Sequence, residues 1–419
     1  MAGQFYGGNM ELKSPLYKRL DKYARVDTQS DDKSGTFPST KKQLTLSKML
    51  AAELKTIGAK KVKLDKYGYV TAKIPATVKG KKPVIGLLAH VDTSPDAPGK
   101  GVRPQLHRAW KGGDIVISRK HGVILNEKNC PKLSLCKGDD IVTASGDTLL
   151  GADDKAGLSI IMTTAEYLLK HKEIPHGTLK IGFTPDEEVG QGVKYFNVKA
   201  FGADYAYTVD GDVAGSIEEE TFNADDFRIK VAGKSVHPGS AKNAMANAAR
   251  IAADIVTAWP ESLIPETTAG HEGFIMFMDI TGETEKAEIY GIARDHNLKN
   301  LKAMERQLEA IVAAKRLKYP LAKIDLTFRE QYRNMKEVIV KHPRVMANLK
   351  AAVEQAGLEP RVKPVRGGTD GARLSFMGLP TPNIFTGGYN YHGRYEWVSL
   401  DGMNKSAEVV VNLVREWAK

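Results

Sequence analysis

The chain has 419 residues, more than one hydrophobic core usually organises, so its length predicts two domains. Hydrophobic residues make up 42% and charged residues 26%, an ordinary globular balance, and no apolar run approaches the roughly 20 residues that a membrane-spanning helix needs. The formal charge of +11 comes from basic residues scattered in pairs such as Lys41-Lys42, without a DNA-reading motif, so we expect neither a nucleic acid nor a membrane as partner.

Cysteine content and the N-terminus bear on location. Cys130 and Cys136 are too few for a disulfide framework, and we expect them to be free thiols in a reducing compartment. The N-terminus lacks the apolar core and cleavage site of a secretory signal, and its first ten residues resemble an extension before the first helix. These features predict a cytoplasmic protein.

The N-terminal half predicts alternating helices and strands. A capping-box pattern at Thr40-Lys41-Lys42-Gln43 opens a helix that Gly58 ends, and the apolar run Pro83–Ala89 predicts a buried central strand. The other expected elements are a hairpin of Lys61–Leu64 and Tyr69–Ile74, an irregular stretch over 93–148, a helix over 155–171, and strands at Leu179–Thr184 and Tyr205–Val209. This alternation favours a mostly parallel sheet covered by helices on both faces.

From about residue 222 the pattern changes to β-α-β-β-α-β, the order of a ferredoxin-like fold. Its expected elements are Phe227–Val231, 241–257, Phe274–Ile280, Glu288–Ala293, 297–315 and Lys323–Arg329. After Asn334 the α/β pattern returns and ends with an amphipathic helix over 400–418. We therefore predict an α/β fold in which a discontinuous main domain, 1–221 and 334–419, carries an inserted α+β domain, 222–333.

Polar side chains interrupt the apolar strands at their carboxyl ends. They are His90 and Asp92, Asp153-Asp154 before a helix, Glu187-Glu188 after a strand, Asp210 at a strand end, and His392 after the expected strand Thr381–Phe385. Ligands of α/β sheets bind outside the carboxyl ends of strands, so these positions should meet in one crevice. Histidine and carboxylates without cysteine are the ligand set of a catalytic zinc or a similar divalent ion.

Each position also has an ordinary explanation. A histidine at a strand end is usually a surface or packed residue, and adjacent acids such as Asp153-Asp154 stabilise helix N-termini. Glu187-Glu188 alone would be a solvated pair, and Asp210 alone could end a strand in a turn. Their coincidence at one sheet edge favours the metal site.

Several longer segments resemble one family. They are HVDTSPD, GADDKAG, PDEEVG, VDG, KSVHPGSAKNAMANAA and GGTDGARLSFMGLPTPNIFTGGYNYHGRYEW. From about residue 10 to the C-terminus the chain resembles the peptidase T branch of the two-zinc peptidases and acylases, which include carboxypeptidase G and aminoacylase. The resemblance implies an aminopeptidase that hydrolyses the N-terminal peptide bond of short peptides, mainly tripeptides. It makes the main domain catalytic and the inserted domain a lid.

The resemblance also implies a role for each polar residue. Asp153 corresponds to a carboxylate that bridges two Zn²⁺ ions, for which Co²⁺ or Mn²⁺ could substitute. The remaining ligands are His90 and Asp210 for one ion, and Glu188 and His392 for the other. Asp92 corresponds to the acid that orients the first histidine. Glu187 corresponds to the general base for an attacking water that bridges the metals.

Two residues of the inserted domain are further candidates. His237 resembles a lid histidine that stabilises the oxyanion of the tetrahedral intermediate, although the adjacent Pro-Gly turn fits a turn-capping surface histidine as well. Arg294 is a candidate for binding the substrate's terminal carboxylate, and a plain surface arginine is nearly as well supported.

Other functions stay open at this point. Within enzymes, a related metallo-dipeptidase or N-acyl amino acid deacylase would use the same metals. Outside enzymes, the chain could be a metal-free interaction scaffold, which the complete ligand set argues against. A nucleic-acid binder is the third alternative, which retention on heparin and strongly salt-dependent binding would support. The sequence leaves open a homodimer, the native metal, the preferred side chains and the residue that recognises the free α-amine.

Overall fold

The computed structural model describes residues 10–419, and the expected extension lies outside the described residues except for Met10. The chain divides into two compact units. Unit 1 comprises the segments up to Glu219, Glu337–Lys363 and Thr369–Lys419, and unit 2 comprises Glu220–Lys336 and Pro364–Gly368. No helix of the described residues is long and apolar enough to cross a bilayer.

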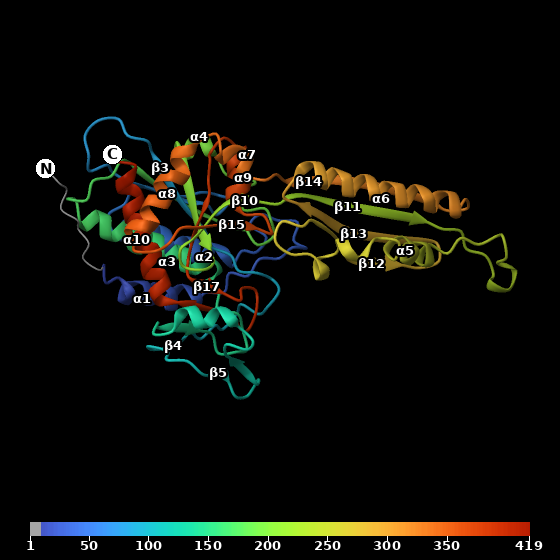
Figure 1. Ribbon diagram of the computed structural model, residues 1–419, viewed down its shortest axis with the longest axis horizontal. Coiled ribbons are helices and arrows are strands. Elements are labelled where there is room, and N and C mark those ends of the chain that lie inside the picture. The colour runs from blue at the N-terminus through green and yellow to red at the C-terminus, as the bar shows by residue number, and fades with distance from the viewer. Residues whose placement is uncertain (1–9) are drawn as a thin grey trace. The chain divides into compact units, whose positions relative to one another are not determined.

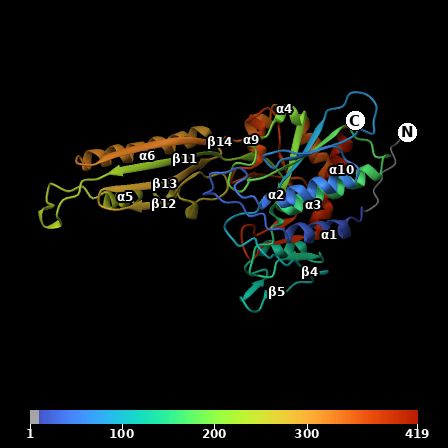
Figure 2. The same ribbon diagram turned by 180° about the vertical axis from the view of Figure 1, so that it is seen from behind.

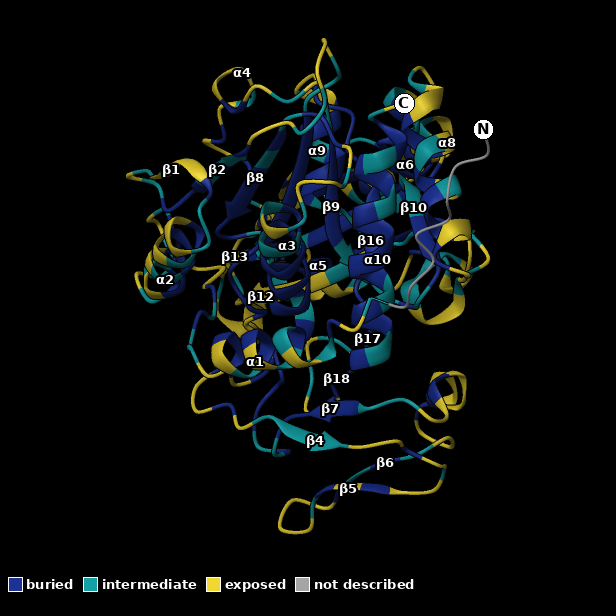
Figure 3. Cartoon of the chain, turned by 90° about the vertical axis from the view of Figure 1, so that its left-hand side faces the viewer, coloured by how far each residue is buried: buried dark blue, intermediate teal, exposed yellow. Residues whose placement is uncertain are grey.

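The main sheet has eight strands in the order β1-β2-β8-β3-β9-β16-β10-β15. In that order they span Lys60–Leu64, Val70–Ile74, Leu179–Thr184, Ile85–His90, Tyr205–Gly211, Asn383–Phe385, Ser216–Thr221 and Arg361–Val365. The central strands β8, β3, β9 and β16 run parallel, whereas β2 pairs antiparallel with β8 and β10 with β16. The continuous apolar runs of the central strands are buried, as Figure 3 shows for β8, β9 and β16.

Helices cover both faces of this sheet. They are α1 (Lys13–Ala24), α2 (Gln43–Thr56), α3 (Ala152–Lys170), α4 (Val198–Phe201), α7 (Lys336–Ile339), α8 (Pro343–Gln355), α9 (Asp370–Phe376) and α10 (Leu400–Glu416). Helix α3 packs on β3 and β9, with α1 and α10 against it, while Phe201 of α4 and Leu374 of α9 pack with Leu88 on the opposite face. Gly157 permits the close approach of α3, because a Cβ there would lie 1.9 Å from the Val209 carbonyl oxygen. The α/β class predicted from the sequence is confirmed.

The irregular stretch over 93–148 carries small strands of its own. These are β4 (Gln105–His107), β5 (Ile115–Ser118), β6 (Val123–Leu125) and β7 (Ile141–Thr143), with the 3₁₀ helix η1 (Pro131–Cys136). Strands β4 and β7 continue a sheet with β18 (Trp397–Ser399) and β17 (Gly388–Tyr389). Trp397 stacks on Tyr389 with ring centroids 4.0 Å apart, inside a core that includes both buried, free cysteines. This core fixes both ends of the loop that carries His392.

Unit 2 is a four-stranded antiparallel sheet in the order β12-β13-β11-β14. Its strands span Phe274–Gly282, Lys286–Asp295, Asn223–Ala232 and Lys323–Tyr332 in that order. Helices α5 (Ala248–Val256) and α6 (Leu298–Lys318) contact one another on one face of this sheet and close a separate core (Figures 1 and 2). The short 3₁₀ helices η2 (Pro238–Ser240), η3 (Glu261–Leu263) and η4 (Pro265–Thr267) lie in its connections. The arrangement is that of a ferredoxin-like β-α-β-β-α-β unit.

Two helix starts differ from the sequence-based prediction. Helix α2 begins at Gln43 with no side-chain cap, because the Gln43 amide donates instead to Asp186 at 2.6 Å. Helix α5 begins at Ala248, seven residues later than predicted, where the Asn247 side chain accepts from the Arg250 N–H. An asparagine cap thus sets the start where the alanine-rich pattern could not.

Candidate metal centre

The ends of the parallel strands supply most of the candidate residues. His90 is the last residue of β3, Asp210 lies at the end of β9, and Glu187 and Glu188 follow β8. His90 pairs in register with Thr184 of β8, and Leu88 with Thr208 of β9, so these ends lie at one level of the sheet. Asp153 enters from the start of α3, and His392 from the loop after β17.

The imidazole of His90 faces carboxylates on both of its nitrogens. Its Nε2 atom lies 2.9 Å from Asp153 Oδ1 and 3.7 Å from Asp210 Oδ1, and the ring is buried. Its Nδ1 atom lies 3.1 Å from the Asp92 carbonyl oxygen and 3.3 Å from Asp92 Oδ1. Burial disfavours protonation of His90, but Asp210, Asp153 and Asp92 outweigh it and raise the pKa well above its ordinary value.

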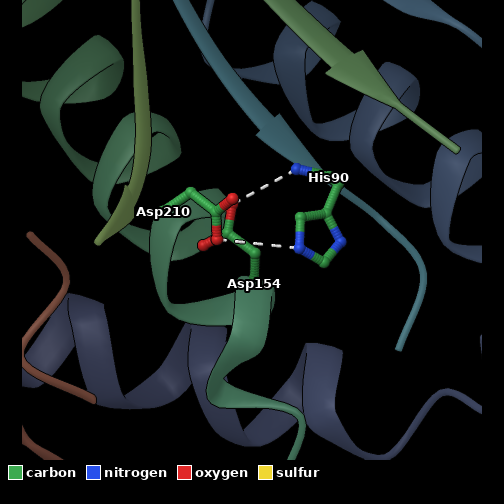
Figure 4. Close-up of side chains that lie close together, drawn as sticks. All are labelled: His90, Asp154 and Asp210. Atoms are coloured by element: carbon green, nitrogen blue, oxygen red, sulfur yellow. Dashed lines mark hydrogen bonds and ion pairs between the residues drawn. The ribbon is translucent and has the colours of Figure 1, made fainter. Parts of the chain in front are cut away.

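The structure separates the neighbours Asp153 and Asp154. Asp154 lies close to His90 and Asp210 (Figure 4), but its oxygens accept backbone N–H groups, Oδ2 from His90 at 3.2 Å and Oδ1 from Gly157 at 3.0 Å. Asp153 instead faces two histidines, since its Oδ2 atom lies 3.4 Å from His392 Nε2. Only Asp153 therefore has one oxygen toward each side of the cluster.

His392 and Glu188 form the other side. His392 Nε2 lies 2.9 Å from Glu188 Oε2, and its Nδ1 lies 3.2 Å from Asp96 Oδ2. The loop turns sharply to present this ring, because Asn390 and His392 both have left-handed backbones, with φ of 53° and 62°. Such values are uncommon for residues other than glycine and recur at functional sites.

Asp92 fixes the residues after β8 as well as His90. Its buried carboxylate accepts from the backbone N–H of Glu187 at 3.0 Å and from that of Glu188 at 3.2 Å. The Glu188 side chain then turns toward His392, whereas the Glu187 side chain forms no hydrogen bond or ion pair with any described residue. The two neighbours thus differ in what their carboxylates contact.

The cluster carries more carboxylates than positively charged partners. No lysine or arginine of the described residues lies within ion-pair distance of its carboxylates, and their ion-pair partners are His90 and His392. Burial, with help from the Asp153 charge, raises the pKa of Asp210 to about 6 and that of Glu188 to about 8. Burial and neighbouring acids, Asp210 first, raise the pKa of Glu187 well above its ordinary value. Glu188 Oε1 is buried without a hydrogen-bond partner among the described residues. Oxygen and imidazole donors with this excess of negative charge fit two divalent metal ions.

Two supporting acids were missed by the sequence analysis. Buried Glu396 accepts from the backbone N–H groups of Leu150 at 2.7 Å, Gly151 at 2.8 Å and Asp153 at 3.1 Å, which ties the His392 loop to the Asp153 loop. Asp186, with φ of 58°, accepts from Ser39 N at 2.6 Å and so fixes the turn before Glu187. Both lie in motifs noted above, YEW and PDEEVG, but their backbone partners are remote in sequence.

The two candidates of unit 2 lie far from one another within that unit. Arg294 pairs with Ala224 at one end of β11, and the segment that carries His237 continues past Ala232 at the other end (Figure 1). Those ends are eight residues, or about 26 Å, apart. His237 is exposed, and its Nδ1 accepts from the Gly239 N–H at 3.2 Å. Arg294 lies over the Tyr332 ring at 5.7 Å, its Nε is buried without a hydrogen-bond partner, and it forms no ion pair with a described residue.

A mostly parallel α/β sheet with a paired histidine and carboxylate cluster at its carboxyl edge fits a metal-dependent hydrolase of the dinuclear type. Residues 149–416 match the family model of Peptidase family M20/M25/M40. The chain belongs to this peptidase family.

Relatives cover nearly the whole chain. A peptidase T of Caldanaerobacter subterraneus subsp. tengcongensis is 46% identical over 406 residues, which cover 97% of this chain and 99% of the relative. A peptidase T of Clostridium perfringens is 45% identical over 404 residues, which cover 96% and 99%. These relatives and the family make the chain a metallopeptidase of the peptidase T type.

Solved structures share the fold. An aminopeptidase PepT from Bacillus cereus has a TM-score of 0.75 at 23% identity, covering 97% of this chain and 99% of the other. A tripeptidase from Staphylococcus aureus has a TM-score of 0.76 at 18% identity, covering 98% and 100%.

Proposed function

We propose that this protein is an aminopeptidase that removes the N-terminal residue of short peptides, preferentially tripeptides, with two zinc ions. One ion would be held by His90, Asp153 and Asp210, and the other by Asp153, Glu188 and His392. The observation that carries the proposal is the Asp153 carboxylate, whose two oxygens face the two histidines at 2.9 and 3.4 Å. When bound, such ions polarise the scissile carbonyl and lower the pKa of water toward neutrality.

Glu187 is the general base in this proposal. Its carboxylate forms no hydrogen bond or ion pair with a described residue, and its backbone N–H is held by the Asp92 carboxylate at 3.0 Å. Glu187 would accept a proton from the attacking water and pass it to the leaving amine, while Asp92 holds the orientation of His90. Its neighbour Glu188 is not available as the base, because its carboxylate already faces His392.

Unit 2 acts as a lid in this proposal. Substrate binding would bring unit 2 over the metal cluster, so that Arg294 binds the terminal carboxylate, while His237 of this copy or of a second copy stabilises the oxyanion. An arginine with a buried, unpartnered Nε and no ion pair is suited to a carboxylate ligand.

The separation of these residues constrains the scheme. The two ends of β11 are about 26 Å apart, which exceeds the length of a tripeptide, roughly 3.3–3.6 Å per residue when extended. One substrate molecule therefore cannot contact His237 and Arg294 of the same copy. If both roles hold, a second copy of the chain supplies His237, in a homodimer. Mixing His237→Ala and Glu187→Gln copies should then restore activity that neither variant has alone, and the absence of restoration would rule out the shared site.

A substrate panel tests the proposal. The zinc-loaded protein is assayed on di-, tri- and tetraalanine, an amidated tripeptide, an N-acetylated tripeptide and N-acyl amino acids, with the released product identified by mass spectrometry. We expect the free tripeptide to exceed the others by roughly 10- to 150-fold in kcat/KM, the worth of one hydrogen-bonded charge pair. Equal cleavage of all peptide lengths would refute the length preference, and preferred cleavage of N-acyl amino acids would indicate a deacylase.

Arg294→Ala should reduce the length preference if Arg294 binds the terminal carboxylate. Arg228→Ala is the matched control, because Arg228 also lies over a tyrosine ring, that of Tyr290, on the same sheet face as Arg294. Unlike Arg294, it already forms an ion pair, with Glu288 at 2.7 Å. Unchanged preference in Arg294→Ala would move the carboxylate site to another residue. The cytoplasmic location expected from the sequence also stays a prediction.

A further inference from the structure

Glu218 of β10 is a carboxyl that the proposed mechanism does not use. Its Oε2 atom accepts from Asn383 Nδ2 at 2.9 Å, and that is its one hydrogen bond among the described residues. No lysine, arginine or histidine of the described chain forms an ion pair with it, although the residue keeps partial contact with solvent. The second oxygen of this carboxylate is therefore available to a ligand.

Strand register places Glu218 on the face of the metal cluster. Glu218 pairs with Asn383 of β16, and Asn383 pairs with Thr208 of β9, two residues before Asp210. The Asn383 side chain bonds to both neighbours, through Glu218 Oε2 and Thr208 Oγ1, so all three side chains share one face. Thr208 also pairs with Leu88 of β3, and His90 lies two residues further along β3 without a register shift, so the His90 side chain lies on that face too.

The same register gives a separation. Glu218 lies two strands from β9 and two residues below the level of Asp210, so their Cα atoms are about 12 Å apart by ordinary sheet spacing. Electrostatics agrees with this placement: burial chiefly raises the pKa of Glu218 to about 8, and the charges of Asp212 and Asp210 add to it. A cation beside the Glu218 carboxylate would offset both the cost of its burial and its repulsion by these two acids.

We propose that the Glu218 carboxylate binds the α-ammonium group of the residue that the enzyme removes. This inference rests on the proposed aminopeptidase function, and it assigns the amine site that the sequence leaves open. The α-amine is the cation closest to the scissile carbonyl, so a carboxylate on the cluster's own sheet face is within reach of it. The site is thus specific for peptides with a free N-terminus.

A pair of substrates that differ only in the amine tests the assignment. One is Ala-Ala-Ala, and the other is propanoyl-Ala-Ala, in which hydrogen replaces the α-amino group. We expect the unaltered protein to prefer the free amine by roughly 10- to 150-fold in kcat/KM, as for a hydrogen bond between charged groups. Glu218→Gln should reduce that ratio toward one by slowing the free-amine substrate, because the variant lacks the negative charge. The local structure should survive, because the amide oxygen of the glutamine can still accept from Asn383.

The control is Glu219→Gln, which removes a charge one residue along β10, on the opposite face of the strand, and should keep the full ratio. Glu218→Asp, which keeps the charge, should retain part of the ratio even if Glu218→Gln folds poorly. A full ratio in folded Glu218→Gln, or an equal loss in Glu219→Gln, would overturn the assignment. A ratio near one in the unaltered protein would instead refute the aminopeptidase proposal itself.

Discussion

The neighbours Glu187 and Glu188 offer a direct test, because they look equivalent in sequence and differ in the structure. Glu188 Oε2 lies 2.9 Å from His392 Nε2, and its other oxygen is buried without a hydrogen-bond partner among the described residues, whereas the Glu187 carboxylate forms no hydrogen bond or ion pair with a described residue. We therefore expect Glu188→Gln to lose metal and Glu187→Gln to lose turnover. Both substitutions keep side-chain size, so packing should change little.

The magnitudes follow from these contacts. A general base is worth about 10²- to 10⁴-fold in rate, or roughly 2.7–5.4 kcal/mol at 1.36 kcal/mol per factor of ten, so kcat of Glu187→Gln should fall by that factor at unchanged metal content. Loss of a residue that only hydrogen-bonds to a metal ligand typically lowers metal affinity 10- to 100-fold, so Glu188→Gln, which alters a proposed ligand, should lower the affinity for one ion by at least that factor. At fixed zinc, a 100-fold weaker site removes about 2.7 kcal/mol of stabilisation of the folded state.

The assay combines metal analysis by mass spectrometry, thermal unfolding with and without zinc, and kcat on a tripeptide. Asp96→Asn is the control, because Asp96 is exposed and pairs with His392 Nδ1, whereas Glu188 pairs with His392 Nε2. Near-normal turnover in Glu187→Gln would refute its role as base. Full metal content with a normal melting temperature in Glu188→Gln would refute its role as a ligand.

Three other predictions concern the supporting structure. Asp153→Asn should lower the content of both ions, whereas His392→Ala should first lower one, and equal losses in the two variants would contradict a shared ligand. Glu396→Gln should weaken zinc affinity about 10- to 100-fold yet recover much of kcat at high zinc, because it acts through the backbone of the Asp153 loop; a kcat loss that zinc cannot restore would contradict this. Leu308→Ala in α6, where Leu308 is 0% exposed, should destabilise unit 2 by about 2–5 kcal/mol, seen as faster hydrogen exchange in β11 and β13 at unchanged zinc content, and unchanged exchange would contradict the packing.

Much of the fold could be predicted from the sequence because its signals are local. The apolar run before His90, and those before Pro185 and Asp210, identify buried parallel strands, and their carboxyl ends must share one edge. The β-α-β-β-α-β order of unit 2 is likewise a local pattern. The positions of the small strands β4 to β7 could not be predicted, because each spans only three or four residues, too few for a period to show.

The parts of the site that depend on long-range backbone contacts could not be predicted. The local pattern does not separate Asp153 from Asp154, which only the family resemblance distinguished. The physical difference is that His90 and Gly157 donate their N–H groups to Asp154. Glu396 bonds to N–H groups 243 to 246 residues away, and no side-chain pattern signals such a contact. Glu218 becomes a candidate only through the register that joins β10, β16 and β9.

The most direct measurement is a zinc titration of the metal-free protein, with bound metal and tripeptide hydrolysis followed in the same samples. With two ions sharing Asp153, we expect full activity to require two equivalents of zinc per chain, and Asp153→Asn to stay inactive throughout the titration. Full activity at one equivalent or less, or an active Asp153→Asn variant, would contradict the paired metal site.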